Sequence, residues 1–169
     1  MARGGGRFLD LSEGEREMKR LGQVLKNFED GKDLRKQMTR EIRQTANPVR
    51  QEARAAIRSM PSKGGYRKGR PLRAAIAQKI QIASRPTGRF VGVKITAGQT
   101  GSVRGFTHAA RKTNFGRWRH PVFGDSANWV SQNGEPGWFD NTMLRNRPTF
   151  RRAVRAVLED YANRIARRI

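Results

Sequence analysis

The sequence of 169 residues contains no cysteine, so disulfide frameworks and thiolate metal sites are excluded. No apolar run approaches the roughly 20 residues that a helix needs to cross a bilayer. The opening residues, MARGGGRFLDLSEGE, include arginines but no apolar segment, which is unlike a secretory signal. The lack of cysteine fits a reducing compartment. We therefore expect synthesis in a cytoplasm and no membrane partner.

Apolar residues are also scarce, at 36% of the chain. A chain of this length is typical of one domain, and its core is expected to be modest. We expect a flexible basic arm over residues 1–10 and a single α+β domain over 11–169. Within that domain we place helices at about 11–60, a sheet with loops at about 61–147, and a C-terminal helix at about 148–169.

Positive charge is what the sequence has in excess, with 36 Lys and Arg against 14 Asp and Glu, a formal net charge of +22. All the acids lie before residue 53 or after residue 124, and 16 Lys and Arg without one acid occupy the segment from Arg54 to Arg119. So much like charge favours anionic partners. Nucleic acid is the first candidate, acidic protein surfaces the second and anionic membranes the third.

Apolar residues at helical spacing predict two helices in the first 60 residues. The first covers 11–28, and Ser12 with Glu15 forms a capping box at its start. The second covers 34–60 and contains Pro48. Because proline lacks the backbone donor and clashes with the previous turn, we expect a kink or break near 44–48.

Period-two alternation of apolar residues predicts a β-hairpin with strands at 79–84 and 89–96. The segment PLRAAIAQ (71–78) before it is typical of a short helical turn, and 107–116 is expected to form a second short helix that ends at Gly116.

The last helical pattern is expected to begin with Pro148 in its first turn. The segment before it, which contains all three tryptophans, is expected to supply one or two strands and a loop. This order predicts an α+β fold with helices on one face of a small antiparallel sheet.

The sequence gives little support for a metal, phosphate-binding or catalytic site. His108 and His120 are twelve residues apart, no HExxH spacing occurs, and the phosphate-loop pattern is absent. A nuclease site using His120 and Asp125 is the least favoured hypothesis, because their spacing does not force the side chains together. We expect no enzyme activity, no metal and no cofactor.

The basic segment is the strongest signal for a nucleic-acid surface, because each phosphate that is neutralised releases counterions. The candidate residues are Lys63, Arg67, Lys68, Arg70, Arg73, Arg104, Arg111 and Lys112.

The aromatic residues after this segment suit packing and docking better than base stacking, because the pattern of a stacking platform is missing. The candidate docking residues are Trp118, Phe123, Trp129, Trp138 and Phe139. We expect residues 120–124 to enter the sheet as a strand. The rings at 129, 138 and 139 are expected on a loop that packs under the C-terminal helix or against a neighbouring subunit.

Three segments in this order carry a family resemblance: AAIRSMPSKGGYRKGRPLRAAI, IQIASRPTGRFVGVKI and RWRHPVFGDSANWVSQNGEPGWF, before an amphipathic C-terminal helix. Over roughly residues 30–169 the chain resembles the small tail-completion or minor tail proteins of long-tailed bacteriophages, found at the head–tail junction. It departs from that pattern at Val122, where an acid is often expected, in the insertion GDSANWVSQNGEPGW, and in its very high charge.

The resemblance implies an α+β subunit that acts by assembly. The expected partners are further copies of the chain in a ring, neighbouring neck or tail proteins, and double-stranded DNA in the channel. The expected location is the virion, with the host cytoplasm during assembly. A standalone basic DNA- or RNA-binding protein, nucleoid- or ribosomal-like, is the alternative function.

Overall fold

The structure is a computed structural model, and the residues that it describes are 20, 23, 31–61, 71–85, 92–100, 107–122 and 125–167. The arm expected at 1–10 and nearly all of the helix expected at 11–28 lie outside these residues.

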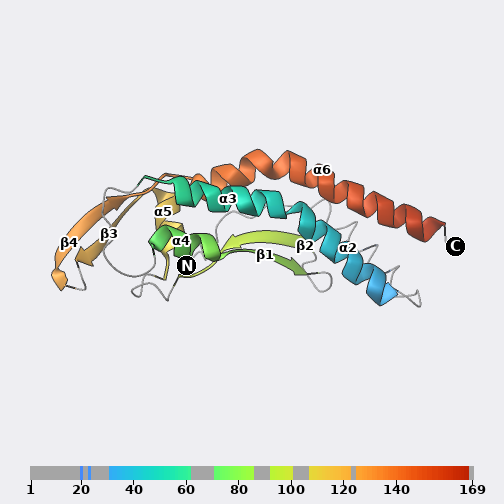
Figure 1. Ribbon diagram of the computed structural model, residues 1–169, viewed down its shortest axis with the longest axis horizontal. Helices are drawn as coiled ribbons and strands as arrows, with labels where there is room; N and C mark the ends of the chain where they lie inside the picture. The colour runs from blue at the N-terminus through green and yellow to red at the C-terminus, as the bar shows by residue number, and fades with distance from the viewer. Residues whose placement is uncertain are drawn as a thin grey trace. The chain divides into compact units, whose positions relative to one another are not determined.

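The fold is α+β, as the sequence predicts, with antiparallel strands in two separate two-stranded sheets, β1–β2 and β3–β4. Figure 1 labels the elements in chain order: α2 (Gly31–Thr45), α3 (Asn47–Ser59), α4 (Leu72–Gln78), β1 (Ile80–Arg85), β2 (Gly92–Ala97), α5 (Ala109–Phe115), β3 (Arg117–Val122), β4 (Asp125–Asn133) and α6 (Trp138–Ala166).

The described chain divides into two compact units. The first holds α3 from Gln51, α4, α5, β3, β4 and the start of α6 up to Met143. The second holds α2, the first residues of α3 and α6 from Leu144. The strands β1 and β2 each contribute residues to both units, so the division falls inside regular elements and not at a linker.

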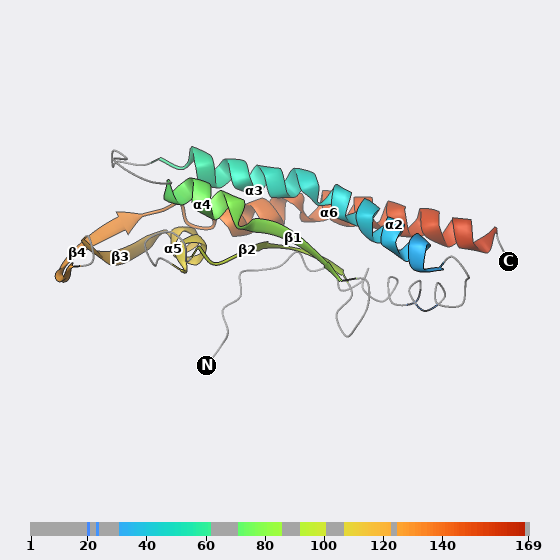
Figure 2. The same ribbon diagram turned by 60° about the horizontal axis from the view of Figure 1, so that its bottom comes forward.

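The kink or break expected near 44–48 is confirmed as the bend between α2 and α3 (Figures 1 and 2). Ala46 is the one residue between the helices, and its backbone N–H donates to the carbonyl of Arg43 at 3.2 Å. Pro48 is the second residue of α3, where an amide has no partner within the helix. The proline therefore starts the new helix at no cost in hydrogen bonds.

Arginine side chains tie the end of α3 to the elements that follow it in the first unit. The Arg54 guanidinium donates to the carbonyl of Ile80 at 3.0 Å. The Arg73 guanidinium donates to the carbonyls of Met60 and Arg58. Cations stabilise the carbonyl end of a helix, so Arg73 acts as a cap for α3.

The prediction that the last helix begins at Pro148 was wrong, because α6 begins ten residues earlier and Pro148 lies inside it. A proline inside a helix removes one hydrogen bond and costs about 3 kcal/mol. Trp138, Phe139 and Met143 are buried in the first turns, and burial of each large side chain contributes about 1.5–3 kcal/mol. Their burial offsets the cost of the proline.

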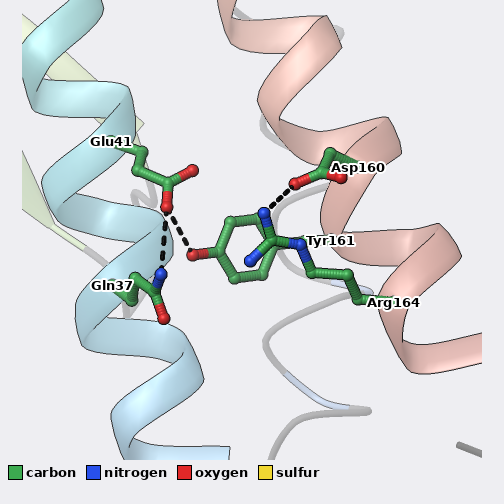
Figure 3. A network of polar contacts seen from close by, with 5 residues as sticks. All are labelled: Gln37, Glu41, Asp160, Tyr161 and Arg164. Atoms are coloured by element: carbon green, nitrogen blue, oxygen red, sulfur yellow. Dashed lines mark hydrogen bonds and ion pairs between the residues drawn. The ribbon is translucent and has the colours of Figure 1, made fainter.

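In the second unit α2 and α6 are joined by a buried tyrosine (Figure 3). The Tyr161 side chain is fully buried, and its hydroxyl donates to Glu41 Oε1 at 2.9 Å. The amide of Gln37 donates to the same oxygen at 3.3 Å, and the Arg164 guanidinium lies 5.0 Å from the centre of the tyrosine ring. Arg164 also pairs with Asp160 at 2.6 Å.

Burial raises the pKa of Tyr161 from its ordinary 10.0 to about 12, and the hydrogen bond to Glu41 and the charge of Glu41 act in the same direction. The folded chain therefore holds this proton more tightly than the unfolded chain. The resulting stability is fully present below pH 10 and is lost as the pH rises from 10 to 12.

Tyr161→Phe is expected to lower the free energy of unfolding by about 0.5–1.5 kcal/mol at pH 7, because one hydrogen bond is lost and the Glu41 carboxylate loses a donor. Between pH 10 and 12 the difference between the two proteins is expected to shrink, since only the parent has a tyrosine to titrate at this position. Urea unfolding followed by circular dichroism measures both effects.

Asp160→Ala is the matched control, because it removes the solvent-exposed pair with Arg164, which is expected to contribute little to stability. A Tyr161→Phe protein as stable as the parent at pH 7 would show that the bond to Glu41 contributes nothing.

Candidate functional site

The hairpin formed by β3 and β4 is the most exposed regular element that the structure describes, and both views show the two strands side by side (Figures 1 and 2). The register pairs Arg117 with Asn133, Arg119 with Ser131 and Pro121 with Trp129, and an irregularity follows after Pro121. All seven side chains from 127 to 133 in β4 are exposed. Neither face of this strand is therefore covered along that stretch.

The base of the hairpin is held by close backbone packing that only glycine permits. Gly116 has φ +94°, and a Cβ at this position would lie 2.5 Å from Cγ of Pro136. A Cβ on Gly134 would lie 2.5 Å from the carbonyl oxygen of Thr113. The N–H of Gly134 donates to the carbonyl of Gly116, which closes the hairpin at its root.

Asn114 connects this base to the start of α6. Its Oδ1 accepts from the backbone N–H of Phe139 at 2.9 Å, and its Nδ2 donates to Asp140 Oδ2 at 3.0 Å. Its backbone carbonyl accepts from the N–H of Gly137 at 2.7 Å. The side chain thus satisfies an amide at the helix start that has no partner within the helix.

The expectation that Trp129, Trp138 and Phe139 lie on a loop was wrong. Trp129 lies in strand β4. Trp138 and Phe139 are in the first turn of α6 and buried, with ring centres 5.5 Å apart in an edge-on arrangement. The indole N–H of Trp138 donates to Oγ1 of Thr113 at 3.2 Å, so the buried indole has a hydrogen-bond partner within the chain. A side-chain hydrogen-bond partner and a buried apolar face together make the helical position more stable than a loop.

The docking candidates differ in how exposed they are. Trp118 is buried, like Trp138 and Phe139. Trp129 in β4 is 50% exposed and is the candidate that a partner reaches most readily. Phe123 and Gly124 lie outside the described residues. The strand expected at 120–124 is present over 120–122, but it pairs with β4 in a second sheet and does not join the sheet of β1 and β2.

The candidate nucleic-acid residues also differ in their contacts and exposure. Arg73 caps α3, as described above. Arg111 is exposed, with its guanidinium 5.4 Å from the centre of the Phe115 ring, and Lys112 is half-buried. The remaining candidates lie outside the described residues: Lys63, Arg67, Lys68, Arg70 and Arg104.

The residues considered for chemistry do not form a site that the structure describes. His108 is exposed before α5. In the backbone register His120 pairs with Val130 and Asp125 with Val122, so the two strands do not place these residues opposite each other. No group of three potential metal ligands occurs among the described residues. Within the same residues, no helix has the length and apolar character to cross a membrane.

Comparisons of the chain with protein-family models, with curated proteins and with solved structures give no match.

Reasoning from the sequence missed the residues that hold the hairpin. Gly116 was expected only as the end of a helix, which α5 confirms. Asn114 and Gly134 were not identified, although an asparagine two residues before a helix-ending glycine and a glycine two residues before a proline are turn signals. What the sequence could not show is that these two turns contact each other.

Gly116→Ala is expected to destabilise the fold by about 1–3 kcal/mol, because a side chain at positive φ is strained and the new Cβ meets Pro136. Urea unfolding followed by tryptophan fluorescence measures the loss.

Gly98→Ala is the matched control. A Cβ there makes an ordinary contact of 3.4 Å with the carbonyl oxygen of Lys79, and its φ lies outside the strained range. Equal losses from both substitutions would contradict a special role for Gly116.

Proposed function

We propose that this protein is a phage virion structural protein of the neck or tail-completion type. It assembles as a homo-oligomeric ring at the head–tail interface, around the path of the DNA. Its partners are copies of itself and neighbouring neck or tail proteins, and it acts without catalysis or cofactor. It is made in the host cytoplasm and ends in the virion.

The β3–β4 hairpin is the observation that carries this proposal. A two-stranded hairpin alone is marginally stable in water, yet this one leaves β4 exposed from residue 127 to residue 133. Trp129 and Val130, 50% and 39% exposed, are neighbours on opposite faces of the strand. An element with a fixed base and an exposed outer strand suits a subunit that completes its packing with a neighbour.

The order of elements gives further support. The resemblance to tail-completion proteins rests on a helix, a loop with proline and glycine, a short turn, alternating strands, a further strand and a last helix. The described elements run α3, α4, β1, β2, β3 and α6 over the corresponding segments.

A standalone nucleic-acid-binding protein is the second candidate function, and the net charge of +22 favours it. Such a protein binds DNA or RNA as a monomer, with an affinity that falls steeply as salt is added. A ring subunit instead forms a discrete oligomer, so the mass of the assembly separates the two functions.

Native mass spectrometry of the full chain is expected to show one closed oligomer, and cryo-electron microscopy to show rings. Val130→Arg is expected to shift the protein to monomer, because it places a charge on the face of the hairpin opposite Trp129. Leu144→Arg, at a residue of α6 that is 50% exposed, makes the same chemical change and is expected to leave the oligomer intact.

A parent protein that stays monomeric at every concentration, with and without DNA, would overturn the ring. A ring that withstands Val130→Arg would instead show that subunits meet elsewhere.

A further inference from the structure

One face of the β3–β4 hairpin collects residues that are far apart in the sequence. Residues that pair directly across two antiparallel strands share a face, and so do every second residues along one strand. By the register, Arg117, Arg119, Trp129, Ser131 and Asn133 therefore share one face. All five side chains are exposed, and we call this set the arginine face.

The arginine face carries positive charge and hydrogen-bond donors, without any negative charge. It has two guanidinium groups, an amide and a hydroxyl as donors, one indole ring, and no acid. Asn133 lies opposite Arg117 and Ser131 lies opposite Arg119, so neither arginine has an opposite charge as its cross-strand neighbour. Such a face is complementary to a phosphate backbone and to the hydrogen-bonding edges of bases.

The shape of the element decides which nucleic acid fits. The major groove of B-DNA is about 12 Å wide and admits a two-stranded β-ribbon. Two strands lie about 4.8 Å apart, so a bare hairpin enters such a groove, whereas a wider sheet does not. A ribbon in a groove needs the face that meets the bases uncovered, and the arginine face meets that condition because all five of its side chains are exposed.

The hydrogen-bonded base of the hairpin holds it in one orientation. Gly134 and Gly116 are hydrogen-bonded to each other, and Asn114 joins the same junction to α6. A recognition element held in one orientation loses little conformational entropy on binding.

We propose that the arginine face of the β3–β4 hairpin binds double-stranded DNA, with the ribbon in the major groove. Arg117 and Arg119 neutralise phosphates, while Ser131 and Asn133 donate to base edges or phosphates. Trp129 makes apolar contact with the groove. This surface is separate from the basic loops that composition alone suggests, and it needs no ring, since every residue belongs to one hairpin of one chain.

The test is fluorescence anisotropy of the full chain with a 30-base-pair duplex over a series of salt concentrations. The double substitution Arg117→Gln/Arg119→Gln is expected to reduce the slope of log K against log salt by about 1.8, since each phosphate contributes about 0.9. At 150 mM salt that corresponds to an affinity roughly 10- to 30-fold weaker.

The control is Arg152→Gln/Arg155→Gln, which removes the same charge from two exposed arginines of α6. It is expected to change the affinity less than threefold. Thermal unfolding followed by circular dichroism checks that both double variants fold like the parent. Equal losses from the two double variants would show a diffuse charge effect, and no loss from the hairpin variant would remove the arginine face from binding; either result overturns the proposal.

Two further probes separate duplex DNA from other anions. A single strand of 30 nucleotides that binds more tightly than the duplex, with Trp129→Ala causing the larger loss, would replace groove binding with base stacking. Polyglutamate that competes as well as duplex DNA, mole for mole of charge, would show a general site for acidic surfaces. Weaker competition from both probes supports the duplex. Ring assembly is measured separately by mass, so its failure leaves this result standing.

Discussion

The contact between the two ends of the β3–β4 hairpin and the start of α6 is the constraint on which the first unit depends. Gly116 turns the chain at a positive φ directly after α5, and the space that a Cβ would need is filled by Pro136. Asn114, two residues earlier, supplies the cap for α6. One short segment thus fixes where a helix ends, where a hairpin begins and where the last helix starts.

The same junction explains how a chain with few apolar residues keeps this part of its fold. Its buried rings are Trp118, Trp138 and Phe139, and the indole N–H of Trp138 donates to Oγ1 of Thr113. A buried polar group that finds its partner contributes to stability, whereas one left without a partner costs about 1–3 kcal/mol. The second unit uses the same device in the bond from Tyr161 to Glu41, which holds α6 to α2.

Local chemistry in the sequence predicted a large part of this fold. Pro48 marked the bend after α2, the alternation of residues 79–96 marked β1 and β2, and Gly116 marked the end of α5. Each signal acts over a few residues, so the sequence alone suffices to read it. The prediction that the last helix begins at Pro148 was wrong because the preference of proline for a helix start is weaker than the stabilisation from burying Trp138 and Phe139. That burial depends on α5, which lies more than 20 residues earlier in the chain.

The candidate surface was harder to predict than the fold, for a related reason. The density of lysine and arginine along the sequence pointed to the loops as the binding surface. A binding surface, however, consists of residues that share a face of the folded chain, and these need not be close in the sequence. Arg119 and Trp129 are ten positions apart, and only the register of β3 with β4 places them on the same side of the ribbon. A shift of one residue in that register would move every β4 side chain to the opposite face. The root of the hairpin therefore decides which face carries the arginines together with the tryptophan, and the glycines at 116 and 134 determine the surface that a partner meets.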